Sequence, residues 1–134
     1  MAVAKSDSLP VRTEQDIVLV RQCVRRLTTE ASFSLVDQTK FVTAASELAR
    51  NTVVHGRGGQ MRWAVLNENG RTAVQLTFED KGPGIPNIEL AMRHGWSSGS
   101  GLGMGLSGAK RLVNQFELTS EPGMGTCVTI TRWK

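Results

Sequence analysis

The chain has 134 residues, 40% apolar and 21% charged, and its 16 Lys and Arg against 12 Asp and Glu give a net charge of +4. This composition is that of a globular domain and excludes a disordered or fibrous polypeptide. No apolar run approaches the ~18 residues that cross a bilayer, and residues 1–12 lack the apolar stretch of a secretion signal. We therefore expect a soluble protein that stays in the cytoplasm and has no membrane partner.

Two helices are predicted after residues 1–12, which form either a frayed tail or a first strand that ends at Val11. Thr13 and Ser34 are each followed three positions later by an aspartate, the pattern of a helix N-cap. Apolar or small residues then recur at three- and four-residue spacing in two stretches: Ile17, Val20, Val24, Leu27 and Ala31, then Phe41, Ala44, Ala45, Leu48 and Thr52. The second stretch runs to His55, and Gly56 ends it.

The rest of the chain predicts two hairpins around a glycine-rich segment. Alternating residues 61–66 and 71–79 predict an antiparallel pair, and residues 80–108 then hold eight of the 14 glycines. A helix is expected from about Gly105, with a buried face made of Leu106, Ala109, Leu112, Val113 and Phe116. A final hairpin is expected from 116–120 and 126–133. We expect a single domain over residues 13–134, with Cys23 and Cys127 as small buried side chains.

Glu47 and Asn51 lie four residues apart on the second helix, so they emerge one turn apart on the same face. The side-chain carbonyl of Asn51 is a hard oxygen donor suited to Mg²⁺, which takes further ligands from water and nucleotide phosphates. Glu47 can accept a proton from an attacking hydroxyl, or hold a water. Taken alone, the pair fits an ordinary polar helix face better than a catalytic site.

Asp80 ends a predicted strand and is followed closely by Gly82 and Gly84. Its carboxylate can accept a hydrogen bond from an exocyclic amine, and the glycines allow a flat ring to approach the backbone, which suits adenine. Thr126, at the start of the last strand, can donate to a ring nitrogen. Ordinary turns at both places are the alternative interpretation.

The third group of residues is Gly101, Leu102, Gly103, Met104, Gly105 and Leu106, which runs directly into a helix. Backbone N–H groups without Cβ atoms beside them, at a helix N-terminus, favour phosphate oxygens. The segment lacks the preceding strand of a dinucleotide fingerprint and the Gly-Lys-Ser/Thr ending of a P-loop.

In this order the motifs resemble the GHKL ATPase superfamily, over about residues 13–133. The resemblance implies a Bergerat-type α+β fold, a two-layer α/β sandwich whose mixed, mostly antiparallel sheet carries helices on one face. It implies ATP and Mg²⁺ as cofactors, with Asn51 as the metal ligand, Glu47 as the base, Asp80 as the adenine partner and the glycines 101, 103 and 105 as a phosphate cradle. His55 also matches a position of the first motif, although a helix-end cap explains it equally well.

The segments Ser46–Asn51, Glu79–Pro86, Gly101–Leu106 and Lys110–Leu112 more closely resemble the RsbT-like serine/threonine switch kinases of bacterial partner-switching, stress-response systems. The resemblance implies a kinase that phosphorylates a STAS-domain antagonist protein and also binds a serine phosphatase. Lys81 departs from the pattern, because the family often has Gln or Asn there.

Two other functions are weighed against the kinase. The same nucleotide fold serves in anti-sigma factors, which sequester a sigma subunit with little catalysis. A nucleic-acid module using Arg21, Arg25 and Arg26 is disfavoured because the chain has no Tyr and few other aromatic residues to stack on bases. We expect no nucleic-acid partner.

Overall fold

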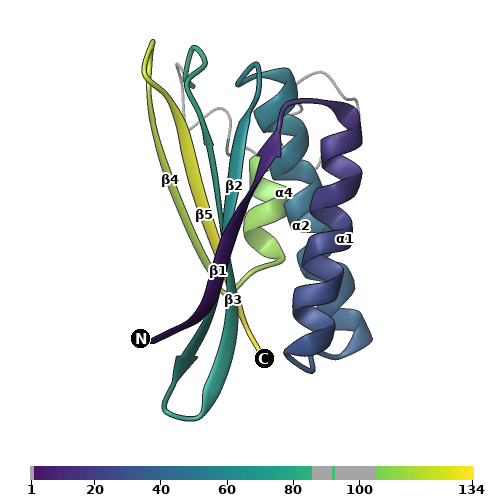
Figure 1. Cartoon of the computed structure of the whole chain (residues 1–134). Coiled ribbons are helices and arrows are strands. Elements are labelled where there is room, and N and C mark those ends of the chain that lie inside the picture. Colours follow the sequence, from purple (N-terminus) through teal and green to yellow (C-terminus); the bar gives the residue numbers. More distant parts are fainter. Residues whose placement is uncertain (1, 86–91, 93–104) are drawn as a thin grey trace.

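The computed structural model describes residues 2–85, 92 and 105–134. One sheet forms one layer and the helices form the other, so the expected two-layer α+β sandwich is confirmed (Figure 1). The elements in chain order are β1 (Ala2–Val11), α1 (Glu14–Glu30), α2 (Leu35–Val54), β2 (Gly59–Glu68), β3 (Arg71–Asp80), α4 (Gly105–Arg111), β4 (Gln115–Glu121) and β5 (Gly125–Trp133). Among the described residues, no helix is long and apolar enough to cross a membrane.

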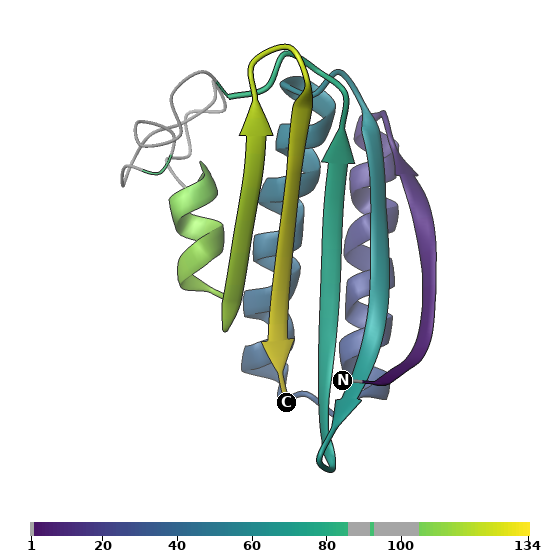
Figure 2. The ribbon, with the colours of Figure 1, turned by 90° about the vertical axis from the view of Figure 1, so that its left-hand side faces the viewer.

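The five strands lie in the order β1-β2-β3-β5-β4. All four pairings between these strands are antiparallel, within a sheet that we expected to be mostly antiparallel. Figure 2 shows the sheet from its outer face, with the helices behind it. β5 lies between β3 and β4 in the sheet, although β4 comes before β5 in the chain, and β4 forms the edge of the sheet directly after α4.

The two long helices begin at the caps that the sequence predicts. The Thr13 hydroxyl accepts a hydrogen bond from the Asp16 amide at 3.2 Å, and the Asp16 carboxylate accepts one from the Thr13 amide at 3.2 Å. Together the two bonds form a complete capping box. The Ser34 hydroxyl accepts from the Asp37 amide at 3.1 Å. These bonds satisfy N–H groups that a helix start leaves unpaired, which explains why both helices begin where they do.

The inner face of α2 is made of small and apolar side chains and lies against β2 and β3. Phe41 and Leu48 are fully or almost fully buried, and Ala44 and Ala45 let the helix approach the sheet. On either side α2 contacts α1 and α4, so it is the central element of the helical layer (Figure 2). A side chain on the α4 side of α2 therefore faces the space between α2, α4 and the sheet.

Two arginines of α1 contact protein groups. The sequence analysis weighed them as part of a nucleic-acid surface. The Arg21 Nε donates to Ser46 at 2.7 Å, and the Arg25 Nη1 donates to Gln38 at 3.3 Å. Both bonds run from α1 to α2. They give these two arginines a role in packing the helices.

The structure corrects the predicted end of the last helix and the environment of one cysteine. The helix stops at Arg111, and Phe116 belongs to β4, where it pairs with Ile130. Apolar residues at 112, 113 and 116 continued the helical spacing across a short connection, which misled the sequence pattern. Cys23 is buried as expected, but Cys127 is half-buried and pairs with Glu79 and Thr119 on the outer face of the sheet.

An ion pair between Asp37 and Arg132 makes the stability of the fold depend on pH. The hydrogen bond from Arg132 is the main cause that lowers the pKa of Asp37 from its ordinary value of 3.8. A lowered pKa in the folded state means that the pair contributes fully above the unfolded pKa, and that this contribution is lost as the pH falls through the folded value. We expect the Tm difference between the unaltered chain and Asp37→Asn to stay constant above about pH 5 and to narrow as the pH falls below the ordinary value of 3.8. Thermal melts followed by circular dichroism test this, and a constant difference would contradict it.

Candidate functional site

A cavity of about 60 Å³ lies between α2, the ends of β3 and β5, and the start of α4. Five residues that the sequence singled out separately line it: Asn51, Asp80, Gly84, Leu106 and Thr126. Its apolar wall consists of Leu48, Phe78, Ile85 and Val128, and His55 and Gly56 complete it at the end of α2. Residues up to 80 positions apart, Leu48 and Val128, therefore meet around one space. The volume is below the roughly 300–1,000 Å³ of whole ligand sites, so it accounts for part of a nucleotide only.

The sheet register places the two polar residues of this wall side by side. Asp80 is the last residue of β3 and pairs with Thr126 near the start of β5. Both therefore lie on the helix-facing side, following Phe78 and its partner Val128. Asn51 approaches from α2 and Leu106 from the first turn of α4.

The carboxylate of Asp80 is oriented by two glycines. Its Oδ1 accepts from the Gly82 amide at 2.9 Å, and Gly56 packs so closely that a Cβ there would overlap the Asp80 carboxyl group. Gly82 in turn has the backbone of Gly56 within 2.8 Å of where its own Cβ would lie. Gly82 is absent from the cavity wall, so its place is to orient Asp80, whereas Gly84 lines the cavity itself.

Gly84 has a φ of +78°, and a Cβ on it would meet the backbone carbonyl of Glu121. Glycine adopts this backbone conformation without the strain that a side chain would bring. Glycine is therefore required at position 84 because the turn between β4 and β5 lies against its backbone.

The Thr126 hydroxyl belongs to a small network centred on Ser120, a residue that the sequence analysis did not select. Ser120 Oγ accepts from the Ile85 amide at 2.7 Å and lies 3.1 Å from the Gly125 carbonyl and 3.0 Å from Thr126 Oγ1. Ser120 has one hydrogen to give. When the Ser120 hydroxyl donates its hydrogen to Thr126 Oγ1, the Thr126 hydroxyl keeps its own hydrogen and can donate it to a ring nitrogen. Only the pairing of β4 with β5 reveals this contact, because the residue lies in an ordinary strand.

Glu47 lies one helical turn before Asn51, as the spacing predicts, but it does not line the cavity. Its side chain is buried, with 7% of the residue exposed. None of the three ion pairs between described residues includes it. Among the described residues this buried carboxylate thus has no ionic partner, and burying such a group unpaired costs stability.

The proposed phosphate cradle is only partly visible. Gly101, Leu102, Gly103 and Met104 lie outside the described residues. Gly105 and Leu106 are buried and form the start of α4. The described part of the motif thus places Leu106 on the cavity wall.

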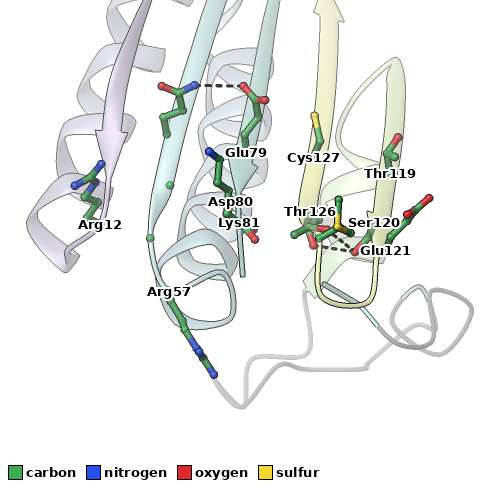
Figure 3. Close-up of a pocket in the computed structure, with 15 residues that line it drawn as sticks. Arg12, Arg57, Glu79, Asp80, Lys81, Thr119, Ser120, Glu121, Thr126 and Cys127 are labelled. Carbon is green, nitrogen blue, oxygen red and sulfur yellow. Dashed lines mark hydrogen bonds between the residues drawn. The ribbon is translucent and has the colours of Figure 1, made fainter. Parts of the chain in front are cut away.

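A second, larger hollow of about 890 Å³ lies on the outer side of the same strand ends (Figure 3). Arg12 and Arg57 lie on one side of it and Glu121 on the other, with Lys81 between them. It shares Asp80 and Thr126 with the cavity but includes no residue of α2 or α4. Lys81 lines this outer hollow and not the cavity, so its departure from the family pattern lies outside the cavity wall.

The donor groups of the cavity fit a nucleotide with a divalent cation. An apolar wall suits a flat ring, Asp80 is an acceptor at one end, and the Asn51 carbonyl is a hard oxygen on the α2 side. Among residues 2–85, 92 and 105–134, no three His, Cys, Asp or Glu side chains gather as a metal site.

Adding a methyl group to Gly56 tests whether the orientation of Asp80 matters. We expect Gly56→Ala to displace the Asp80 carboxylate and weaken ATP binding about tenfold, since a hydrogen bond to a charged group contributes about 1.5–3 kcal/mol. Gly70→Ala in the turn between β2 and β3 is the control: its φ of +79° strains any side chain, so its Tm should fall, but its Cβ would meet nothing within 4 Å and the Asp80 carboxylate stays in place. Calorimetric titration with an ATP analogue measures both, and equal affinities would contradict the expectation.

Comparisons with known proteins agree with this arrangement. A family model described as "Histidine kinase-, DNA gyrase B-, and HSP90-like ATPase" matches residues 36–134. The chain is 42% identical over 123 residues to the serine/threonine-protein kinase RsbT of Bacillus subtilis, and the match covers 92% of each chain. It is 37% identical over 98 residues to an anti-sigma F factor of Clostridium beijerinckii, covering 67% of this chain and 66% of that protein.

The crystal structure of the RsbU and RsbW domains of Rv1364c from Mycobacterium tuberculosis matches with a TM-score of 0.61 and 22% identity. The match covers 96% of this chain and 33% of that chain, and at this identity it supports the fold alone. The superfamily inferred from the motifs is confirmed by the family model and the kinase relative. The chain therefore belongs to the histidine kinase-, DNA gyrase B- and HSP90-like (GHKL) ATPase family, in its group of serine/threonine switch kinases and anti-sigma factors.

Proposed function

We propose that the chain is a serine/threonine protein kinase that transfers the γ-phosphoryl group of ATP to a STAS-domain antagonist protein of a partner-switching system. The observation that carries the proposal is the meeting of Asn51, Asp80, Gly84, Leu106 and Thr126 around one cavity. A relative named as a serine/threonine-protein kinase, aligned over 92% of the chain, supports the same activity.

In the proposed mechanism, the adenine ring lies against Phe78, Ile85 and Val128, with its exocyclic amine donating to Asp80. Asn51 supplies an oxygen ligand for Mg²⁺, and the bound cation would neutralise charge on the phosphate oxygens. Glu47 accepts the proton of the attacking hydroxyl. Phosphoryl transfer needs positioning and charge neutralisation more than covalent chemistry, so this short set of groups is sufficient.

The glycines 101, 103 and 105 complete the proposal as the donors that hold the phosphates. Only Gly105 among them lies within the described residues, at the first position of α4. Backbone amides at such a position attract phosphate oxygens. A kinase that uses ATP in this way would act in the cytoplasm, where ATP is available.

The direct test is incubation of the purified chain with γ-labelled ATP, Mg²⁺ and a purified STAS-domain antagonist protein from the same organism. We expect label to move to one serine or threonine of that protein, and not to a variant whose acceptor residue is alanine. ATP binding without any transfer to the STAS-domain protein would contradict the proposed kinase activity.

Asp80→Asn is expected to weaken ATP binding by about 10- to 100-fold, because the charge is lost and the single oxygen of asparagine is taken by the Gly82 amide, which leaves its NH2 donor facing the adenine amine. GTP offers no amine at that position of the ring, so the selectivity for ATP over GTP should fall together with the affinity. Competition titrations with the two nucleotides measure this. Unchanged selectivity would remove Asp80 from the adenine site.

The alternative function is an anti-sigma factor that sequesters a sigma subunit with little catalysis. The relatives named anti-sigma F factor favour keeping it, since one is 37% identical over 98 residues. Such a protein would bind a purified sigma factor in a nucleotide-dependent way. A metal-dependent serine phosphatase is the other partner to test, since switch kinases of this type exchange partners. Binding to the sigma factor without transfer to the STAS-domain protein would favour the alternative.

A further inference from the structure

An arginine occupies a position of β5 that the strand pattern reserves for an apolar residue. Arg132 follows Val128 and Ile130 on the side of β5 that faces the helices, and it pairs with the fully buried Val74. Only 15% of its side chain is exposed. Its Nε atom is buried and has no hydrogen-bond partner within the part of the chain that the structure describes.

The guanidinium group of Arg132 joins three elements. Its Nη1 donates to the Leu112 carbonyl at 2.7 Å, directly after the end of α4. Its Nη2 donates to Asp37 Oδ1 at 2.7 Å, in the first turn of α2. One rigid, planar group thus links β5, α4 and α2, and the flexible ammonium group of lysine does not reproduce that fork.

The charges at the two helix ends suit this bridge. The carbonyl groups at the end of α4 carry partial negative charge, and a cation there is favourable. Asp37 is the acidic residue that suits the positive start of α2. Arg132 lies between these two negative groups, so its contacts are complementary at both ends.

Stability alone does not explain an arginine here. Removing a guanidinium group from water is costly, and replacing a buried ion pair by apolar residues is often neutral or stabilising. The unpaired Nε adds to the cost. What the bridge does provide is a fixed position of the end of α4 relative to α2.

That geometry affects the nucleotide cavity. The seven residues of α4 span only about 10 Å and are too few to form a stable helix on their own, so tertiary contacts must set its position. Its first turn brings Leu106 to the cavity, opposite Asn51 of α2. Arg132 holds the chain directly after the other end of α4, so that this end of α4 is tied to α2 through Asp37.

We propose that Arg132 is a positioning residue of the nucleotide site, which sets the place of α4 against α2 through Leu112 and Asp37. The inference rests on the proposed function, because it takes the cavity to be the ATP site. It assigns Arg132 no contact with ATP or Mg²⁺.

The test compares Arg132→Met and Arg132→Lys with a control, Arg62→Met. Arg62 makes the ion pair with Glu79 on the outer face, at 2.6 Å, away from α4. Three quantities are measured on each full-length chain: the Kd for MgATP, the hydrogen exchange of the α4 amides, and the Tm without nucleotide.

Arg132→Met is expected to raise the Kd for MgATP about tenfold and to speed exchange of the amides of residues 105–111, while β2 and β3 stay protected. The Kd and the α4 exchange rates of Arg132→Lys should lie between those of the unaltered chain and those of Arg132→Met, because lysine retains the charge but not the planar fork of donors. Arg62→Met should leave Kd and α4 exchange unchanged. If Arg132→Met does not fold, Asp37→Asn, which removes the charge that Arg132 pairs with, is expected to give the same changes at a smaller size.

A folded Arg132→Met chain that binds MgATP as tightly as the unaltered chain would overturn the inference, and so would unchanged exchange in α4. A lowered Tm with normal Kd would show that Arg132 only stabilises the fold. If the unaltered chain binds MgATP but does not transfer phosphate, the proposed kinase fails while the Kd comparison still decides the role of Arg132. No MgATP binding by the unaltered chain would overturn both.

Discussion

Asn51→Ala is expected to lower the affinity for MgATP by about 100-fold or more and to reduce phosphorylation of the STAS-domain protein to background. In the proposed site this carboxamide is the protein ligand of the cation, and alanine offers no oxygen in its place. The backbone carbonyl of Asn51, which accepts from the amides of His55 and Gly56 at 2.9 and 3.1 Å, is unaffected by the substitution. The end of α2 should therefore keep its structure.

The matched control is Asn67→Ala, which removes a carboxamide at the far end of β2, where Asn67 accepts from Thr72 at 3.2 Å. Titrations with ATP in the presence and absence of Mg²⁺ separate loss of the cation from loss of the nucleotide. We expect the Mg²⁺-dependent part of the affinity to disappear in Asn51→Ala and to persist in Asn67→Ala. Full Mg²⁺ dependence in Asn51→Ala would assign the ligand to another group.

Glu47→Ala is expected to slow phosphoryl transfer by about 10²- to 10⁴-fold, the usual contribution of a general base, while ATP binding changes little. Because Glu47 lies outside the cavity wall, its loss leaves the nucleotide contacts in place. A buried carboxylate with no ionic partner among the described residues destabilises the fold, so the variant should melt at the same temperature as the unaltered chain or higher.

Glu117→Ala, on the outer face of β4, is the control for removing a carboxylate. Single-turnover measurements of phosphate transfer, with ATP affinity measured on the same preparation, distinguish the two effects. Equal losses of binding and transfer in Glu47→Ala would make Glu47 a structural residue. A fall in Tm would lead to the same conclusion.

Local signals in the sequence predicted most of the elements. The caps at Thr13 and Ser34 and the alternation in the two hairpins each depend on residues within a few positions of one another. The last helix was predicted too long, because the apolar residues at 112, 113 and 116 continue its spacing although the chain has already turned into β4.

The residues of the nucleotide cavity were also selected from local chemistry. An aspartate at a strand end, a carboxamide on a helix face and glycines before a helix each suggest a ligand without reference to the others. The sequence pattern groups Gly82 with the binding residues. In the structure Gly82 does not line the cavity, and its amide donates to Asp80 and so orients the carboxylate. The distinction depends on Gly56, 26 positions earlier, which packs against the same carboxylate.

The sequence by itself determined most of the segments that are helix or strand and the candidate side chains of the site, because caps, alternation and residue type act over short distances. Only the tertiary structure decided what lies beside what: the bridge of Arg132 to Leu112 and Asp37, the contact of Ser120 with Thr126, and the outer hollow that holds Lys81. These contacts join residues whose separation in the chain reaches 95 positions. They exist because the strand order places β5 between β3 and β4 and packs α4 beside α2, an arrangement that burial of the whole core sets and no local pattern encodes.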